Sequence, residues 1–185
     1  GLAGAILCAK PYLNGEPFAL LLGDELLYVN QGEENCIQKL VNVYEKTGKS
    51  VIATIEVFGD DVSKYGNIGI REESDGIITV DKIVEKPSIN EALSNNAIIG
   101  RYVLSGEVVS MLEKLTPRNN EIYLTDALDE LSNRGDLLAC VCYDDRYDVG
   151  DKFGFIKANI DFSLKSKEIG EDVKNYILEL SDRLK

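Results

Sequence analysis

Histidine is absent from the 185 residues of this chain. Its absence excludes nucleophilic catalysis that depends on a Ser/His or Cys/His pair, and it excludes every metal site that uses imidazole. Carboxylates, ammonium and guanidinium groups and the backbone remain for chemistry. We therefore expect any reaction here to rest on positioning and electrostatics.

Basic residues are few: 20 Lys and Arg stand against 32 Asp and Glu, and the formal net charge is −12. This balance disfavours a general nucleic-acid-binding protein, whose affinity rests on a basic surface. An anionic small-molecule substrate remains compatible with it if a divalent cation and a few lysines reverse the field locally. The chain also lacks an apolar stretch that could span a membrane, and no signal peptide opens it, so we predict no membrane partner.

Cysteine is scarce, and none of the four residues forms a Cys-x-x-Cys pair. Cys8, Cys36, Cys140 and Cys142 lie in apolar or helical contexts, so we predict reduced thiols in a cytoplasmic protein. The alternation of Cys140 and Cys142 is typical of packing along a strand rather than of metal binding. At this length, one domain with a core that needs no disulfide is expected.

Short apolar runs alternate with helical patterns, which predicts an α/β protein. The run 18–22 predicts a strand covered on both faces, 35–44 a helix stopped near Gly48, and 50–58 a second buried strand. A strand, a helix and a strand joined in this way form a βαβ unit, so the sheet is expected to be at least partly parallel. The remaining chain predicts a hairpin at 65–70 and 76–80, strands at 96–104 and 137–143, and helices at 1–13 (ended by Pro11), 105–115, 125–131, 153–164 and 171–184.

Two acidic residues are candidates for a metal site. Asp24 follows Gly23 at the end of the first predicted strand, where ligands bind in open α/β sheets; alternatively, the Gly-Asp pair only turns the chain. Asp148 lies in the charged turn before a helix, where Asp151 is expected to cap the helix instead. Asp24 and Asp148 together would form the water-rich, two-carboxylate site that Mg²⁺ prefers.

A second set of residues suits a sugar phosphate. Glu85 can accept hydrogen bonds from sugar hydroxyls, and Lys86 offers a compact positive charge for a phosphate. A solvated surface pair is the alternative for these two residues. Gly66 and Gly100 are places where the backbone can approach a sugar ring, although each is equally explained as a turn or bulge glycine.

Seven segments, in order along the chain, together resemble the bacterial UTP–glucose-1-phosphate uridylyltransferases, or UDP-glucose pyrophosphorylases. They are 1–10, 17–24, 64–66, 84–87, 97–104, 120–128 and 146–154. The resemblance implies a Rossmann-like nucleotidyltransferase fold of three layers with a mixed, mainly parallel sheet. It also implies a single domain over 1–185, incomplete at its N-terminus, with 166–185 as a helical extension.

The resemblance further implies roles for individual residues. Asp24 and Asp148 match the family's magnesium ligands, and Lys86 matches the lysine that meets the phosphate of the sugar nucleotide. Glu85 and Gly66 match residues that hold glucose hydroxyls. Two more glycines have expected places: Gly100 in a strand lining the sugar pocket, and Gly1 facing the uracil.

Two departures from the family pattern affect these expectations. The family's glycine-rich triphosphate loop, with its arginine and downstream lysine, would precede residue 1, so we expect the 185 residues alone to be inactive. The family more usually has Gly-Leu-Gly-His where this chain has Gly-Leu-Ala-Gly at 1–4. Recognition of the base is therefore the least defined part of the site.

The implied reaction joins UTP and glucose 1-phosphate into UDP-glucose and pyrophosphate with Mg²⁺, in a cytoplasmic homo-oligomer (dimer or tetramer). A sugar 1-phosphate is largely ionised near neutral pH, because its second pKa is about 6, so its oxygen can attack without a general base. Alternatives are a glucose-1-phosphate thymidylyltransferase and a non-catalytic module that binds a sugar nucleotide or serves as a subunit contact.

Overall fold

The computed structural model describes residues 1–30, 32 and 34–185. The chain forms two compact units. The first consists of Gly1–Leu22 and Val29–Asp144, and the second of Gly23–Tyr28 and Asp145–Lys185. The segment 166–185 belongs to the second unit. Both units are therefore built from two separate stretches of sequence.

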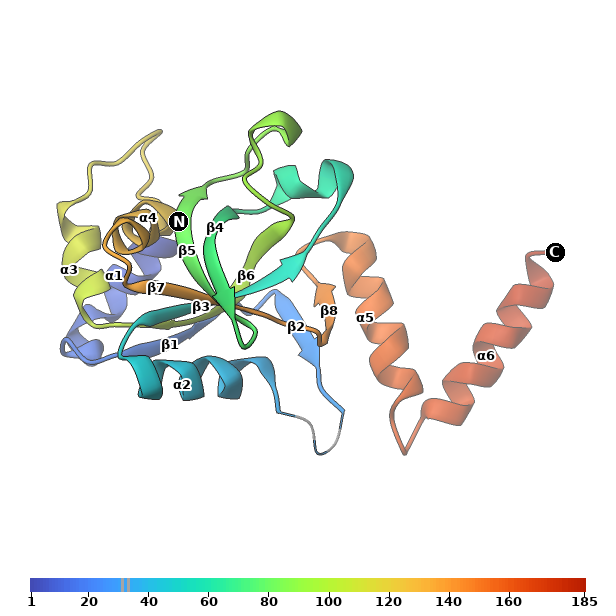
Figure 1. Ribbon diagram of the computed structural model, residues 1–185. Coiled ribbons are helices and arrows are strands. Elements are labelled where there is room, and N and C mark those ends of the chain that lie inside the picture. Colours follow the sequence, from blue (N-terminus) through green and yellow to red (C-terminus); the bar gives the residue numbers. More distant parts are fainter. Residues whose placement is uncertain (31, 33) are drawn as a thin grey trace. The chain divides into compact units, whose positions relative to one another are not determined.

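A six-stranded mixed sheet forms the centre of the first unit (Figure 1). Its order is β1-β6-β3-β7-β5-β4, with bounds Phe18–Leu21, Asn96–Leu104, Ser50–Glu56, Leu137–Val141, Ile77–Val84 and Asn67–Ser74. The predicted α/β class with a mixed sheet is confirmed. Parallel pairing does not predominate, however: among the described strands β3 and β7 pair in parallel, and the other ladders are antiparallel. Strands β1 and β3 run in the same direction, but β6 lies between them.

Helices cover both faces of this sheet (Figure 1). Helices α1 (Leu2–Leu13), α3 (Glu107–Lys114) and α4 (Leu124–Asn133) lie on one face, and α2 (Cys36–Thr47) lies on the other. Two short 3₁₀ helices, Gly59–Lys64 and Ile89–Glu91, lie in the connections between strands. Apolar side chains fill the layers between helices and sheet, among them the fully buried Ile52, Leu104, Leu112, Leu128 and Leu131.

Local sequence explains how α2 begins and ends. The Asn35 side chain accepts a hydrogen bond from the Gln38 N–H, and the Gln38 side chain accepts one from the Asn35 N–H, which forms a capping box. The helix stops where Gly48 adopts a left-handed conformation, as predicted. Helix α1 differs from the expectation, because it continues past Pro11 and ends where Asn14 turns left-handed.

Strand β1 also differs from the expectation. Among the described strands it pairs only with β6 and lies at the edge of the sheet, and its residues alternate between half-buried and exposed. Leu21, predicted to be covered, is 51% exposed. Five consecutive apolar residues predicted a central strand here, but an apolar run does not by itself identify which strands flank it.

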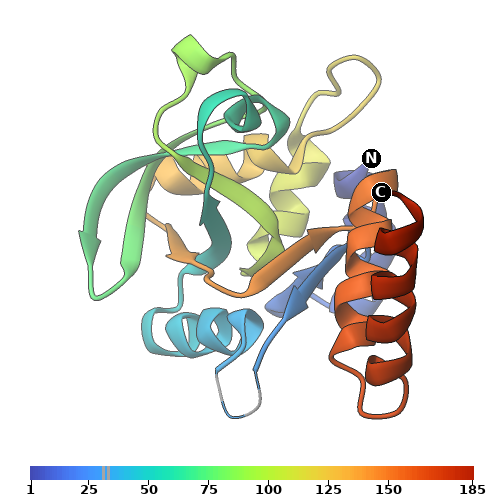
Figure 2. The same ribbon diagram turned by 90° about the vertical axis from the view of Figure 1, so that its right-hand side faces the viewer.

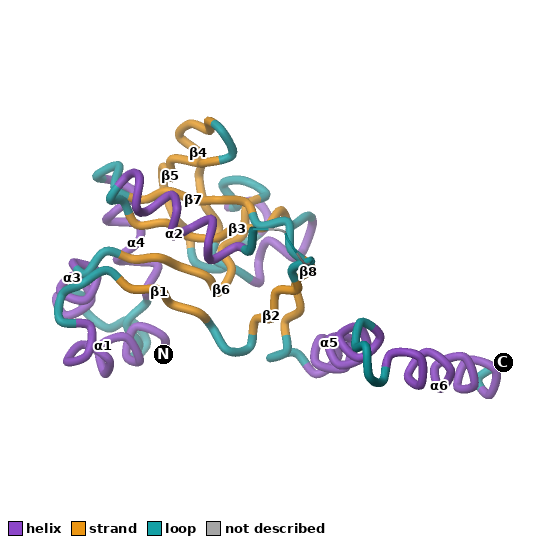
Figure 3. Tube along the Cα trace, turned by 90° about the horizontal axis from the view of Figure 1, so that it is seen from below, coloured by secondary structure: helices purple, strands orange, loops and turns teal. Residues whose placement is uncertain are grey.

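The second unit contains two short strands and two helices. Strands β2 (Glu25–Tyr28) and β8 (Asp145–Asp148) form an antiparallel pair (Figure 3). Helices α5 (Lys152–Leu164) and α6 (Gly170–Arg183) follow as a helical hairpin (Figure 2). The rings of Tyr28 and Tyr147 each meet Phe162 edge-on at 5.4 Å, which fastens α5 to the strand pair.

Much of the apolar surface of α5 and α6 is exposed. Ala158 is the one fully buried residue among those of α5, and no residue of α6 is buried. The exposed apolar residues of the two helices are Phe153, Phe155, Ile156, Ile160, Phe162, Leu164, Tyr176, Leu178 and Leu180, and Leu184 directly after α6 is exposed as well. Within the described part of the chain, no helix combines the length and the apolar character needed to cross a bilayer.

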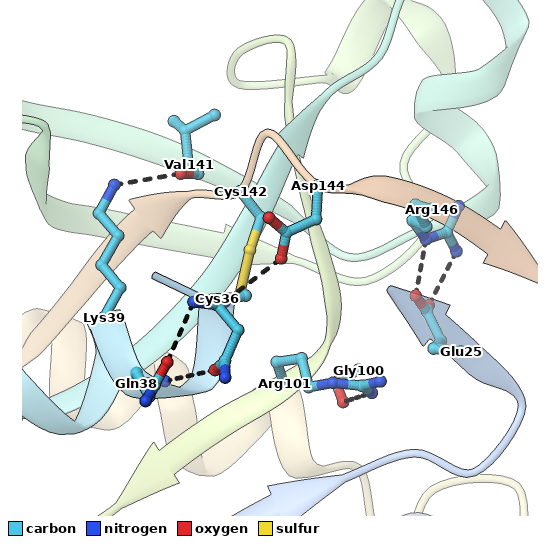
Figure 4. Close-up of a disulfide and its surroundings, with 11 residues drawn as sticks. Glu25, Cys36, Gln38, Lys39, Gly100, Arg101, Val141, Cys142, Asp144 and Arg146 are labelled. Atoms are coloured by element: carbon cyan, nitrogen blue, oxygen red, sulfur yellow. Dashed lines mark hydrogen bonds and ion pairs between the residues drawn. A yellow bond between two sulfur atoms is a disulfide. The ribbon is translucent and has the colours of Figure 1, made fainter. Parts of the chain in front are cut away.

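The prediction of four reduced thiols is wrong for two of them. Cys36, at the start of α2, forms a disulfide with Cys142, just after β7, with 5.8 Å between their Cα atoms (Figure 4). The two residues are 106 positions apart in the sequence, so their meeting depends on the tertiary fold. Cys8 is exposed and free, and Cys140 is buried and free. Burial raises the pKa of the Cys140 thiol.

Candidate active site

The structure brings Asp24 and Asp148 together at one end of the β2–β8 pair. Glu25 lies opposite Asp148 in the ladder, and the Val149 N–H donates to the Asp24 carbonyl at 2.8 Å. A Cβ atom added to Gly150 would lie 3.2 Å from Asp148 Oδ1 and 3.3 Å from Asp24 Oδ2. One carboxylate oxygen of each aspartate therefore borders the same point.

The turn after β8 fixes the Asp148 carboxylate. Its Oδ1 accepts hydrogen bonds from the backbone N–H groups of Gly150 (3.1 Å) and Asp151 (3.3 Å). Asp151 caps α5 by accepting from the Gly154 N–H at 2.7 Å, which confirms the predicted alternative role for that residue. Gly154 in turn leaves room for the Asp148 carbonyl, which a side chain at 154 would meet.

Tyr147, one residue before Asp148, adds a further anchor to this strand. The pKa of the Tyr147 hydroxyl is raised, mainly by burial and secondly by a hydrogen bond to Asp161 of α5. The hydroxyl therefore stays neutral and can donate to Asp161 across the neutral pH range. Together with the ring contacts to Phe162, this bond holds β8 against α5.

The chemistry of this pair fits a hard divalent cation. Asp148 has a side chain that is 42% exposed, and Asp24 is also exposed, so water can complete a coordination shell. Over residues 1–30, 32 and 34–185, no group of three or more His, Cys, Asp or Glu residues is arranged to hold a metal. A cation bound here would consequently have two carboxylate ligands, and the rest would come from water or a phosphate, as Mg²⁺ prefers.

The sequence reasoning missed an ion pair beside these aspartates. Arg146 donates to Glu25 from Nε (2.6 Å to Oε2) and from Nη2 (2.8 Å to Oε1), as Figure 4 shows. The side chains of Arg146 and Glu25 are 13% and 10% exposed. Arg146 Nη2 also lies 3.9 Å from Asp148 Oδ2. The segment 146–154 resembles the family, but its arginine pairs with a glutamate 121 positions away, which leaves no local signal in the sequence.

In the first unit, the structure brings Gly66 and Glu85 together. Gly66 precedes β4, Glu85 follows β5, and the pairing of Asn67 with Val84 places them at the same end of the hairpin. A Cβ atom added to Gly66 would lie 3.4 Å from Glu85 Oε2 and 3.2 Å from Ile98 Cδ1. The glycine thus keeps a backbone surface open directly beside a carboxylate.

Thr125, at the start of α4, lies beside this pair and was also missed. Its Cγ2 is 3.5 Å from the same added Cβ position at Gly66. Its hydroxyl is buried and has no hydrogen-bond partner among the residues that the structure describes. A buried orphan hydroxyl is uncommon and costs stability, so it marks a position where function rather than packing can explain the residue.

Lys86 adopts a backbone conformation that its side chain disfavours. Its φ angle is 45°, in the left-handed region, and the residue is exposed directly before Pro87. A left-handed non-glycine residue costs roughly 1–2 kcal/mol and persists where the surroundings enforce it, often at binding sites. The sequence predicted the residue but gave no sign of this strain.

The atoms nearest to Gly100 and Gly1 do not belong to the Gly66–Glu85 pair. A Cβ atom at Gly100 would lie 2.6 Å from Leu22 Cβ, and the Gly100 carbonyl accepts from the Leu22 N–H at 2.9 Å. Packing against Leu22 therefore explains this glycine. Gly1 lies beside Glu121, with 3.7 Å between its nitrogen and Glu121 Oε1. Their expected roles at the sugar and the uracil stay predictions.

The family described as "Nucleotidyl transferase" matches residues 1–164. The chain belongs to the nucleotidyl transferase family. The fold class and the resemblance inferred from the sequence are thereby confirmed.

Relatives within the nucleotidyl transferase family give a more specific likeness. The chain is 43% identical over 187 aligned residues to UTP–glucose-1-phosphate uridylyltransferases of Streptococcus pyogenes and Streptococcus pneumoniae. These alignments cover 100% of this chain and 62% of the relatives, so the chain spans about 62% of the length of the curated relatives it matches.

Solved structures agree with this likeness. A UTP-bound UGPase from Acinetobacter baumannii matches with a TM-score of 0.87 and 33% identity, over 97% of this chain and 62% of that one. A UDP-glucose pyrophosphorylase complexed with UDP-glucose matches with a TM-score of 0.84 and 35% identity, over 90% and 63%. A putative glucose-1-phosphate thymidylyltransferase from Bacillus anthracis, at 22% identity and a TM-score of 0.70, shares the fold alone.

Proposed function

We propose that the full-length protein carrying this chain is a UTP–glucose-1-phosphate uridylyltransferase. The observation that carries the proposal is the 43% identity to such enzymes over the whole chain. The Asp24–Asp148 pair and the Gly66–Glu85 pair support it, because each offers the chemistry that one substrate group requires. The products would be UDP-glucose and pyrophosphate, which places the protein in nucleotide-sugar biosynthesis.

The proposed residues act by binding and orienting the reactants. Glu85 accepts hydrogen bonds from glucose hydroxyls, the open backbone at Gly66 lets the ring approach, and Lys86 balances the charge of the sugar phosphate. Asp24 and Asp148 hold Mg²⁺, which supplies neutralisation of phosphate charge when it is bound. Gly100 and Gly1 are proposed to border the sugar and the uracil.

The chemical step needs no proton-transfer residue. A phosphate oxygen of glucose 1-phosphate forms a bond to the α-phosphorus of UTP in line with the breaking bond, and pyrophosphate leaves. The attacking oxygen is already ionised near neutral pH, because the second pKa of such a phosphate is about 6. A chain without histidine can therefore carry out this reaction.

The test is pyrophosphate release by the full-length protein with UTP, glucose 1-phosphate and Mg²⁺. We expect activity with UTP above that with dTTP, loss of activity in Asp24→Asn and Asp148→Asn, and little turnover by residues 1–185 alone. An active D24N/D148N double variant would contradict the assignment of the two aspartates. Preference for dTTP would contradict the assignment of the nucleotide.

We further propose that the protein is a cytoplasmic homo-oligomer, a dimer or a tetramer. The exposed apolar residues on α5 and α6 support this part, because burying such surface between copies is favourable. Sedimentation of the full-length protein at several concentrations tests the proposal. A monomer at every concentration would contradict it.

A further inference from the structure

The Glu25–Arg146 ion pair lies where it can decide how available Asp148 is to a cation. Glu25 directly follows Asp24, and it is the residue paired with Asp148 across the β2–β8 ladder. The guanidinium group makes two hydrogen bonds to Glu25, at 2.6 and 2.8 Å, and its Nη2 lies 3.9 Å from Asp148 Oδ2. One positive group thus stands between the two carboxylates of a single ladder position.

Arg146 binds Glu25 more strongly than it binds Asp148. Two short bonds in the fork geometry make the Glu25–Arg146 contact the strong one, whereas 3.9 Å to Asp148 Oδ2 is too long for a hydrogen bond. Asp148 is oriented instead by the backbone N–H groups of Gly150 and Asp151, which take up only its Oδ1. The Oδ2 atom is therefore left with a nearby positive charge that another carboxylate already balances.

We infer that Glu25 is a positioning residue that occupies Arg146 and so leaves the Asp148 carboxylate to a divalent cation. Without the Glu25 charge, the guanidinium still lies 3.9 Å from Asp148 Oδ2, and an Arg146–Asp148 bond would compete with the cation for that oxygen. The inference rests on the proposed function, because that proposal assigns Asp148 as a metal ligand.

The charge count shows why Glu25 and Arg146 act as a unit. Removing the Glu25 charge alone takes away one negative charge near the cation, and it is the charge of the carboxylate that accepts both short bonds from Arg146. Removing both charges restores the net charge of the site and also removes the competitor. A residue that merely stabilised the strand pair would not show this recovery, since the double change removes both hydrogen bonds as well.

The experiment measures Mn²⁺ binding to the full-length protein by electron paramagnetic resonance, without turnover. For Glu25→Gln we expect the Kd to rise by about 10-fold or more, as is usual when a group supporting a metal ligand is changed. For Glu25→Gln with Arg146→Gln we expect a Kd within about threefold of the wild type. The control is Arg71→Gln with Asp81→Asn, an exposed pair in the first unit, which should leave the Kd unchanged.

Asp148→Asn separates failure of the inference from failure of the proposed function. If D148N binds Mn²⁺ as the wild type does, the metal assignment fails and the inference falls with it. If D148N loses binding while E25Q keeps it, or if the double variant binds as weakly as E25Q, the inference alone is overturned. Should E25Q fail to fold, Glu25→Asp keeps the charge but withdraws it from Arg146, and a Kd unchanged in that folded variant overturns the inference.

Discussion

Replacement of Gly150 by alanine tests the carboxylate pair most directly. Gly150 has no left-handed φ angle, so alanine suits its backbone. The added methyl carbon would lie 3.2 Å from Asp148 Oδ1 and 3.3 Å from Asp24 Oδ2, which is tighter than most such contacts. Both carboxylates must therefore move by a few tenths of an ångström, and the space that they border is partly filled by an apolar group.

We expect this change to weaken cation use without unfolding the protein. Displaced metal ligands typically cost 10- to 100-fold in metal affinity, or about 1.4–2.8 kcal/mol. Stability should change by less, because alanine lowers the entropy of the unfolded chain by an amount worth about 0.4–1 kcal/mol, which offsets part of the crowding. The effect should therefore appear in the magnesium dependence and not in the melting temperature.

The assay is pyrophosphate release at increasing Mg²⁺, together with thermal unfolding. Gly23→Ala is a matched control, because Gly23 adjoins Asp24 and an added Cβ there meets nothing within 4 Å. We expect G23A to keep the magnesium dependence of the wild type. If G150A keeps it too, or if G23A is impaired equally, the two aspartates do not form the cation site.

Thiol reactivity and substitutions at Lys86 and Thr125 test other features of the structure. Without reductant, a thiol reagent should modify Cys8 of the native protein fast and Cys140 slowly. The slow reaction is expected because burial and a raised pKa disfavour the Cys140 thiolate even at mildly alkaline pH. Four reactive thiols would exclude the disulfide. Lys86→Gly and Lys86→Ala should both lose activity. In urea unfolding, the glycine variant should be more stable than the alanine variant by about 1 kcal/mol, because only alanine keeps the strain at φ 45°. Equal stabilities of the two variants would refute that strain. Thr125→Val should unfold at the same or a higher temperature, because it removes a buried hydroxyl that has no partner within the described part of the chain. A loss of stability of more than about 1 kcal/mol would reveal a bond to that hydroxyl.

Local pattern was sufficient for much of the first unit. The strand predicted at 96–104 has the observed bounds Asn96–Leu104, and the hairpin turns at Asp75 and Gly76, both left-handed, where the second predicted arm begins. These elements carry their own signals: β-branched runs, a turn pair and a capping box. The tertiary contacts of these elements are consistent with their local signals, so the local signals were sufficient to predict them.

Where contacts are distant, the sequence was insufficient. Strands β2 and β8 have four residues each, and Asp145–Asp148 is so charged that it reads as a turn; each becomes a strand because the other pairs with it. The disulfide depends in the same way on residues far apart along the chain. The edge position of β1 could not be inferred either, because strand order is not a local property.

The candidate site also contains residues that could be predicted from the sequence and residues that could not. Asp24 and Asp148 were predicted to share one cation, and Gly66 and Glu85 were predicted to border a sugar; the structure brings the members of each pair together. The Glu25–Arg146 pair was not identified, because a glutamate and an arginine 121 positions apart give no local signal. The unpartnered state of Thr125 exists only once the fold has excluded water from its hydroxyl.

The discontinuous make-up of the second unit has a consequence for synthesis of the protein. Glu25 leaves the ribosome long before its ladder partner Asp148. At 5–20 residues per second, the delay is between about 6 and 25 s. Most of the central sheet is available to fold during that interval, whereas Asp24 has to wait for the late strand to emerge. The aspartate pair is thus among the last features of the nascent chain to assemble, and a polypeptide released after residue 141 but before residue 148 would contain all six strands of the sheet but not the pair.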